Sequence, residues 1–261
     1  MNTNTREFAS NYRKLIRCSA LLIDGFTAPV HKIVSRFSVG FHYFQTVICL
    51  VTAGPTYEPL DGARRITNFS TGQLGTELAN FLAAHGHEVA LLIGQQATYP
   101  GERRAQHVET FTTTADLSAR LEARIGRAVG AVFHAAAVSD FSFGKVWSRG
   151  PGGELNEITS GKYSTRHGTL LAELVPTKKV IVSLRGWFPE ARLTGWKYEV
   201  DGVRTDVIHA AEKQIAECRL DACVANGPAY GSGFGLLNQG SVCTHIEDKL
   251  ALFDALERSL R

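Results

Sequence analysis

The chain of 261 residues has the composition of an ordinary globular protein. Apolar residues make up 44% and charged residues 20%, which supports a sizeable core and excludes a disordered chain. Its 28 basic and 25 acidic residues leave a net charge of +3, too weak a bias to indicate nucleic-acid binding. No apolar run is long enough to cross a membrane, and the five scattered cysteines form no Cys-x-x-Cys pair. We therefore expect a cytoplasmic protein of one or two domains, with neither nucleic acid nor membrane as partner.

The first 45 residues differ from the remainder of the chain. They are basic and poorly periodic, and they lack the short apolar core and cleavage site of a secretory signal. A transit peptide is one interpretation. An appended segment, with translation starting near Val47 from an alternative codon, is another. We expect residues 1–45 to be an N-terminal extension of unknown role and residues 46–261 to be the functional domain.

From residue 46 onward, apolar runs alternate with amphipathic stretches. The first run, Thr46–Thr52, is short and continuous, as expected of a strand buried on both faces. Leu74, Leu78 and Leu82 then recur at helical spacing, and Gly86 ends that helix. The alternation predicts a Rossmann-like three-layer α/β fold with a mostly parallel sheet. Further strands are expected at Glu88–Ile93, Val108–Thr112, Ala131–Ala136, Arg192–Tyr198 and Ala222–Ala225, and further helices at Ala115–Ile125, Lys178–Phe188, Val207–Cys218 and Asp248–Ser259.

A long segment from Phe141 to Gly168 interrupts this alternation after the third or fourth strand. It contains the chain breaker Gly150–Gly153 and is too long for an ordinary connection. We expect an irregular loop that serves as a lid or binding arm or is disordered. The leucine-rich run Leu170–Leu174 that follows it fits neither helix nor strand clearly.

Three turns at expected strand ends suit a nucleotide, because open parallel sheets bind ligands beyond the carboxyl ends of their strands. Thr52–Thr56 follows the first strand. Ser70–Gly75 opens a helix whose free N–H groups and dipole favour a phosphate. Ala135–Asp140 combines small residues, which admit a ring or a phosphate, with a carboxylate for a metal-bound phosphate. Each turn also has an ordinary interpretation as a helix cap or as strand-end packing.

Together these segments resemble a known family. Thr52–Asp61, Arg64–Gly72 and Ala135–Phe141 are similar to phosphopantothenoylcysteine synthetase, the ligase half of the bifunctional flavoprotein of coenzyme A biosynthesis. The resemblance covers about residues 47–261. No segment before it is long enough for the family's flavin-binding half, so we expect no flavin. Further matches are Lys162–Thr165, Leu174–Pro176, Gly195–Glu199 and Asp221–Asn226.

The resemblance implies a ligase that joins 4'-phosphopantothenate to cysteine with CTP or ATP and Mg²⁺. In this family the substrate carboxylate attacks the nucleotide α-phosphate, pyrophosphate leaves, and the cysteine amine captures the acyl-nucleotide. A carboxylate and a triphosphate repel each other, so such a site needs cations and hydrogen-bond donors. The resemblance also implies a homodimer, with the 141–168 arm reaching the partner subunit.

The resemblance further assigns roles to individual residues. Asn68 is expected to steady an acyl oxyanion in the second half-reaction, and Arg64 to grip the substrate phosphate across a dimer interface. Lys162 is the expected catalytic lysine. Lys145 is its rival, because the gap between Asp140 and Lys162 is longer than in the family. Expected nucleotide contacts are Gly54, Ser70, Thr71, Gly72, Ala136, Asp140, Lys197, Lys213 and Phe234, with Asp140 also binding Mg²⁺ and Asn226 beside Phe234 in the base pocket.

Several assignments have ordinary alternatives. Arg65 competes with Arg64 for the phosphate, and Asn68 has a second interpretation as a turn residue. Lys213 has one as a solvated helical lysine, whereas His134 is expected to be a core residue with a satisfied side chain. Two other functions remain open, an NAD(P)-binding reductase and a degenerate nucleotide-binding protein. Against the reductase, the chain has no Tyr-x-x-x-Lys pair and no acidic residue at the end of its second expected strand.

Overall fold

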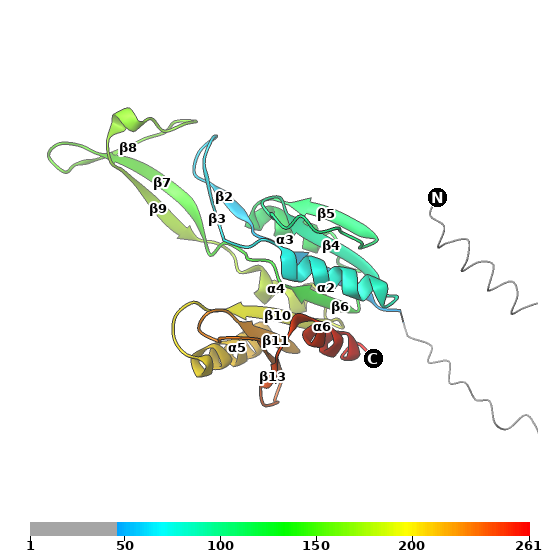
Figure 1. The fold of residues 1–261 in the computed structure, drawn as a ribbon. Coiled ribbons are helices and arrows are strands. Elements are labelled where there is room, and N and C mark those ends of the chain that lie inside the picture. The colour runs from blue at the N-terminus through cyan, green and yellow to red at the C-terminus, as the bar shows by residue number, and fades with distance from the viewer. Residues whose placement is uncertain (1–45) are drawn as a thin grey trace, which may run out of the picture. The chain divides into compact units, whose positions relative to one another are not determined.

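The computed structural model describes residues 46–261, and their central feature is an eight-stranded sheet (Figure 1). The expectations for residues 1–45 lie outside the described residues. The sheet has the order β13-β12-β11-β10-β6-β1-β4-β5. Its strands are β1 (Ile48–Ala53), β4 (Glu88–Gly94), β5 (His107–Phe111), β6 (Ala131–His134), β10 (Arg192–Tyr198), β11 (Ala222–Asn226), β12 (Phe234–Asn238) and β13 (Thr244–Ile246).

The six strands from β11 to β5 are mutually parallel, and β12 and β13 extend the sheet in antiparallel fashion. From β1 the chain builds outward through β4 and β5. It then returns to the other side of β1 with β6 and continues through β10 and β11. The direction of building therefore reverses between β1 and β6. The carboxyl ends of these two strands flank the place where open α/β sheets bind ligands.

Helices cover both faces of the sheet, which confirms the predicted three-layer fold. Because side chains alternate along a strand, neighbouring residues of β1 enter opposite layers. Val51 belongs to one apolar cluster with Leu78 and Phe253 from the helices on one face, and Leu50 belongs to a second cluster with Leu184 on the other. The first layer contains α2 (Gln73–Ala84) and α6 (Lys249–Arg258), and the second contains α3 (Thr114–Glu122), α4 (Val180–Trp187) and α5 (Arg204–Cys218).

The segment expected to be an irregular loop is instead a three-stranded antiparallel sheet that projects from the main sheet in Figure 1. Its strands are β7 (Phe141–Arg149), β8 (Leu155–Glu157) and β9 (Leu170–Pro176), in the order β8-β7-β9. We call residues 141–176 the ribbon. The expectation of an irregular loop was wrong because backbone pairing forms these strands: both faces are largely exposed, so no alternation marks them in the sequence.

A short hairpin also lay outside the predictions. β2 (Tyr57–Pro59) and β3 (Arg65–Thr67) pair antiparallel directly after β1. Each has three residues, and β3 is exposed throughout, so neither carries a hydrophobic pattern. The two antiparallel strands at the sheet edge, β12 and β13, were missed as well.

The other elements lie close to their predicted positions. The helix expected at Ala115–Ile125 ends at Glu122, and Gly126 adopts a positive φ of 81° in the turn that follows. α5 begins at Arg204 rather than Val207, because the Asp206 carboxylate accepts a hydrogen bond from the amide preceding its first turn. Within residues 46–261, no helix has both the length and the apolar character required to cross a membrane.

Candidate functional site

Hydrogen bonds join the turns that follow β1 and β6. We call this place, where the strand order reverses, the switch point. Ala137 N donates to Gly54 O over 3.0 Å, and Thr56 N donates to Ala137 O over 3.1 Å, so Pro55 and Ala137 form a parallel bridge. The Nδ2 of Asn68 donates to the same Ala137 oxygen, also over 3.1 Å. Asn68 is thus fixed beside the turn, while its side-chain oxygen has no partner among the described residues. The structure brings Gly54, Asn68 and the 135–140 segment together.

A buried polar pair, Thr52 and His134, contacts the backbone of the turn after β6. Thr52 Oγ1 accepts a hydrogen bond from Ala136 N at 3.3 Å and lies 2.9 Å from His134 Nδ1. His134 is 5% exposed, and burial lowers its pKa to about 4, so its imidazole is neutral near pH 7. His134 is therefore a buried residue with a hydrogen-bond partner, as expected.

The start of α2 lies against the turn after β1. Gly72 precedes the helix with φ +78°, and a Cβ on Gly72 would approach Gly54 Cα to 3.3 Å and Ile93 Cδ1 to 2.9 Å. Only glycine combines this backbone conformation with so close an approach. The N-cap Gly72 offers no side chain to the first turn of α2, and that turn contains no acidic residue. The N–H groups of Leu74 and Gly75 and the helix dipole therefore suit an anion.

Ser70 and Thr71 immediately precede Gly72, the N-cap residue of α2. Ser70 N donates to Asn68 O over 2.9 Å, which links the helix start directly to Asn68. Thr71 O accepts from Tyr99 N at 3.0 Å, and Thr71 Oγ1 accepts from Gln73 N at 3.3 Å. The predicted phosphate turn is thus held in place by its backbone, next to Asn68.

Asp140 follows the same switch-point turn. Thr56 Oγ1 accepts from Ser139 N at 2.8 Å, and Thr177 N donates to Asp140 O over 2.9 Å, so the backbone on both sides is fixed. The Asp140 side chain is exposed. Within residues 46–261, no group of three or more His, Cys, Asp or Glu side chains is arranged to hold a metal ion. One carboxylate fits Mg²⁺ that is bound mainly through substrate phosphates.

The hairpin contacts the ribbon on both sides of Lys162 in the chain, through Arg64 to Tyr163 and through Gly62 to Gly161. Arg64 Nη2 donates to Tyr163 O over 2.8 Å, and Gly62 N donates to Gly161 O over 2.8 Å. These bonds hold the residues on both sides of Lys162. The Lys162 side chain is exposed, and its ammonium has no partner within the described part of the chain.

The competing basic residues have partners of their own. Lys145 Nζ lies 2.8 Å from Glu157 Oε2 on the neighbouring strand of the ribbon, and this contact raises the pKa of Lys145. The guanidinium of Arg65 lies 4.5 Å from the centre of the Tyr57 ring. Before any ligand binds, Lys145 is thus paired with Glu157 and Arg65 with the Tyr57 ring. The Lys162 ammonium has no such partner among residues 46–261.

Phe234 and Asn226 lie side by side at the far end of the same sheet edge. Phe234 opens β12, and the pairing of Ala225 with Gly235 sets it level with Asn226 at the end of β11. Asn226 Oδ1 is buried and has no hydrogen-bond partner. Lys197, near the carboxyl end of β10, pairs with Glu199 at 2.8 Å.

Lys213 is not brought to this edge. It lies in the second half of α5, which runs from the carboxyl end of β10 back to the amino end of β11. Its side chain is 73% exposed and lies 3.7 Å from Glu217 one turn further on. Lys213 thus has the environment of a solvated helical lysine.

Trp196, on β10, had no role expected from the sequence. Its indole Nε1 is buried without a partner, as are Thr194 Oγ1 and Arg192 Nε. These residues alternate along β10, so their side chains share the face of the sheet on which α2 and α6 pack. The stretch Gly195–Glu199 carried the family resemblance, and that was the available signal for Trp196.

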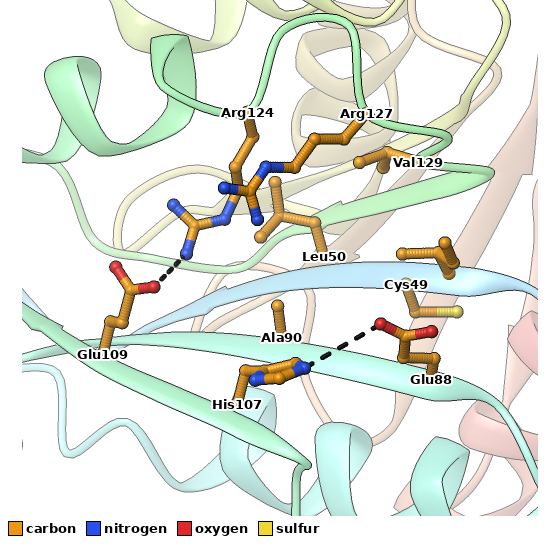
Figure 2. A pocket seen from close by; sticks show the side chains of 10 residues that line it. Cys49, Leu50, Glu88, Ala90, His107, Glu109, Arg124, Arg127 and Val129 are labelled. Atoms are coloured by element: carbon orange, nitrogen blue, oxygen red, sulfur yellow. Dashed lines mark hydrogen bonds and ion pairs between the residues drawn. The ribbon is translucent and has the colours of Figure 1, made fainter.

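A cavity of about 160 Å³ lies elsewhere, at the amino ends of β1, β4 and β5 (Figure 2). Arg124, which pairs with Glu109 at 2.6 Å, lines it together with Arg127. His107 and Glu88 lie across from them, 3.8 Å apart. None of the predicted site residues lines this cavity.

Comparisons with known proteins agree with this architecture. The family described as DNA/pantothenate metabolism flavoprotein C-terminal domain matches residues 44–252. A coenzyme A biosynthesis bifunctional protein CoaBC from Thermococcus kodakarensis is 35% identical over 184 residues, which is 70% of this chain and 42% of that protein. The chain thus spans less than half the length of this relative.

Solved structures share the fold. The DNA/pantothenate metabolism flavoprotein from Streptococcus pneumoniae superposes with a TM-score of 0.70 at 23% identity, over 82% of this chain and 98% of that one. A Cab2 mutant in complex with phosphopantothenate-cysteine gives a TM-score of 0.59 at 19% identity, over 82% and 87% of the two chains. Because the family model spans most of the chain, the chain belongs to the DNA/pantothenate metabolism flavoprotein C-terminal domain family.

Proposed function

We propose that the chain is a phosphopantothenate–cysteine ligase, which activates 4'-phosphopantothenate with CTP or ATP and couples it to cysteine. One observation carries the proposal. Asn68, the open N-terminus of α2 and the turn leading to Asp140 converge at the point where the strand order reverses. That is the expected location of a nucleotide in an open α/β sheet. The family membership of the chain supports the same activity.

The start of α2 would bind the triphosphate. Its free N–H groups donate to phosphate oxygens, and the close approach of Gly54 and Gly72 leaves the backbone accessible to them. Asp140 would share Mg²⁺ with the phosphates. When bound, the ion would neutralise triphosphate charge and so reduce its repulsion of the substrate carboxylate. Phe234 and Asn226 would border the base at the far end of the edge.

Asn68 would act on the acyl group. A side-chain amide stays neutral, so it can orient the acyl-nucleotide without adding a charge that repels it. Its hydrogen bond to Ala137 O restricts the side chain before substrate binds. The cysteine amine would then attack a carbonyl that is already aligned.

Lys162 would supply the positive charge at the α-phosphate, and Arg64 would bind the phosphate of 4'-phosphopantothenate. We favour Lys162 over Lys145 because the Lys145 ammonium is paired with Glu157. Lys162 is also held next to Arg64 by the contacts between hairpin and ribbon. A permanent cation at this point offsets charge that builds up as pyrophosphate departs.

A homodimer is part of the proposal. Ile66 and Phe69 on and after the hairpin, and Phe141, Leu155 and Leu174 on the ribbon, are each more than 45% exposed. A second copy of the chain would cover such side chains and bring the ribbon to a partner's site. Light scattering that gave the mass of a single chain at assay concentrations would contradict this.

The test is release of pyrophosphate from CTP and from ATP, measured with 4'-phosphopantothenate, cysteine and Mg²⁺. We expect release with at least one nucleotide and a loss of about 10²–10³-fold in Lys162→Gln, typical of removing one charge-stabilising group. Lys145→Gln is the matched control and should retain most activity. Loss in Lys145→Gln alone would transfer the catalytic role to that residue.

The same assay separates the other candidate functions. A reductase would release no pyrophosphate and would bind NAD(P)H. A degenerate nucleotide-binding protein would bind CTP or ATP without turning it over.

A further inference from the structure

The side chain of Asp61, in the turn between β2 and β3, is fully covered although the turn itself lies at the surface. Its two carboxylate oxygens have different partners. Oδ1 accepts from Ala63 N at 2.9 Å and from Arg64 N at 2.7 Å, which are bonds within the turn. Oδ2 accepts from Arg64 Nε at 3.0 Å, from Arg64 Nη2, and from Tyr163 N at 3.1 Å.

These bonds join two segments about a hundred residues apart in sequence. Tyr163 contacts the hairpin twice, since its N–H donates to Asp61 and its carbonyl oxygen accepts from Arg64 Nη2 at 2.8 Å. Gly62 completes the contact by donating to Gly161 O over 2.8 Å, and a Cβ on Gly62 would lie 2.8 Å from that oxygen. Lys162 lies between the two anchored residues.

The charges favour a durable contact. The Arg64 guanidinium, together with the surrounding N–H donors, holds the pKa of Asp61 well below its usual range. Asp61 is therefore ionised at any pH at which the protein would work. Charge-assisted hydrogen bonds of this kind are stronger than neutral ones.

The contact also orients the guanidinium. Nε and Nη2 of Arg64 are occupied, whereas Nη1 has no partner among residues 46–261. The Arg64 side chain remains 44% exposed, so a ligand can approach it. A planar guanidinium held through two of its nitrogens presents the third in a fixed direction.

We propose that Asp61 is a positioning residue that aligns the phosphate-binding Arg64 and the loop of Lys162 as one unit. This inference rests on the proposed function for the roles of Arg64 and Lys162. Through its Oδ2 atom, Asp61 sets the direction of one cation and the backbone position of the other. Arg64 would then meet 4'-phosphopantothenate in a preset geometry, with little ordering left to do on binding, and Lys162 would be placed for the charge that develops at the α-phosphate in the transition state.

The substitution Asp61→Asn separates this role from the turn itself. The Asn oxygen can still accept from the amides of Ala63 and Arg64, whereas its NH₂ group cannot accept from Tyr163 or from the guanidinium. Asp248→Asn is the matched control, because Asp248 caps α6 through Ala251 N and asparagine caps helices equally well. Both sites lie outside the core clusters, so both variants should fold.

The first measurement is amide hydrogen exchange in the protein without ligands. In Asp61→Asn we expect exchange at Tyr163 to accelerate about 10-fold or more, as fits the loss of a charge-assisted bond, while Ala63 remains protected. Asp248→Asn should leave Tyr163 unchanged. Unaltered exchange at Tyr163 in Asp61→Asn would overturn the inference, whatever the activity of the protein.

The second measurement is steady-state kinetics of pyrophosphate release. We expect Asp61→Asn to raise KM for 4'-phosphopantothenate about 10-fold or more and to lower kcat, with KM for the nucleotide unchanged. A merely structural role would move all three constants together. Faster exchange with wild-type kinetics would overturn the positioning role.

If the wild-type protein releases no pyrophosphate, the proposed function fails and the alignment of Arg64 is judged by titration with inorganic phosphate. Weaker phosphate binding in Asp61→Asn than in wild type would then support the alignment, and equal binding would overturn it.

Discussion

At the residue scale, Asn68 shows how one hydrogen bond prepares a side chain for chemistry. Its NH₂ group is bonded to Ala137 O, and its oxygen remains available at the switch point. The pattern in the sequence identified Asn68 through resemblance alone. The partner that fixes it lies 69 residues away, and local sequence patterns carry no information on such a contact.

The substitution Asn68→Asp should separate the two half-reactions. A carboxylate cannot donate to Ala137 O, and its charge opposes the oxyanion that forms when cysteine attacks. We expect the acyl-nucleotide to form at a rate near that of wild type, and its transfer to cysteine to slow by about 10²–10³-fold. Single-turnover experiments with labelled nucleotide, analysed by chromatography, would show the intermediate accumulating. Equal loss in both steps would argue against this role.

Contacts of individual residues also favour Lys162 over Lys145 as the catalytic lysine, whereas spacing in the sequence left both as candidates. In the sequence Lys162 was favoured and Lys145 remained its rival, because the gap between Asp140 and Lys162 is longer than in the family. In the structure Lys145 is paired across two strands of the ribbon, and Lys162 follows a residue anchored to the hairpin. This distinction depends on strand register, which exposed strands do not encode in their hydrophobic pattern.

At the element scale, most buried helices and strands were predicted and the exposed ones were not, although β12, which is buried at its centre, was also missed. α2 was predicted because its apolar residues follow the helical period and pack on β1. β2, β3 and the ribbon were not, because their side chains are largely exposed and give no alternation. Periodicity records burial, so an element held by backbone pairing and polar contacts is poorly marked in the sequence.

The close packing of α2 against β1 leaves no room for a side chain at Gly75. A Cβ at Gly75 would lie 2.6 Å from Ala53 Cβ and 3.2 Å from Thr52 O, so the helix and strand would have to separate. We expect Gly75→Ala to lower the free energy of unfolding by about 1–3 kcal/mol. Nucleotide binding should weaken as well, because the start of α2 moves. Urea denaturation and nucleotide titration would measure the two effects.

Gly186→Ala in α4 is the control for this comparison. Gly186 lies in a helix, and a Cβ there meets nothing within 4 Å. Alanine favours the helix, so the free energy of unfolding should rise by about 0.5–1 kcal/mol. Equal effects of the two substitutions would show that helix propensity, and not the contact with β1, decides the outcome.

At the scale of the whole molecule, the alternation of elements predicted the layers and the parallel sheet. It did not predict the order of the strands or the antiparallel extension through β12 and β13. Strand order is decided by which edges meet after the chain has formed its crossovers, and several orders satisfy the same alternation. The convergence of site residues at the switch point could therefore be seen only in the structure.

The stability of the whole domain should depend on pH through His134. Burial lowers its pKa to about 4 from 6.5, so between these values the unfolded chain binds a proton that the folded chain does not. The free energy of unfolding should therefore decrease as pH falls from about 6.5 to 4, by on the order of 3 kcal/mol. Above pH 6.5 His134 is neutral in both the folded and the unfolded chain, so the free energy of unfolding no longer depends on its protonation.

Denaturation at a series of pH values would test this. His134→Gln removes the titrating group but keeps a hydrogen-bonding side chain, and it should flatten the dependence between pH 4 and 6.5. His209→Gln, on the exposed surface of α5, is the control and should leave the dependence unchanged. A wild-type slope in His134→Gln would assign the effect to other groups.

The tip of the ribbon has a consequence for how such a protein can change over generations. Residues 150–154 close the turn with bonds among themselves, from Gly150 N to Glu154 O at 2.9 Å and from Gly153 N to Gly150 O at 3.0 Å. Residues 151–154 are exposed, and the turn joins β7 to the short strand β8. Insertions or deletions in this turn would change the length of the ribbon without disturbing the switch point between β1 and β6. The length of the turn can therefore vary between related proteins as the surface that the ribbon contacts varies.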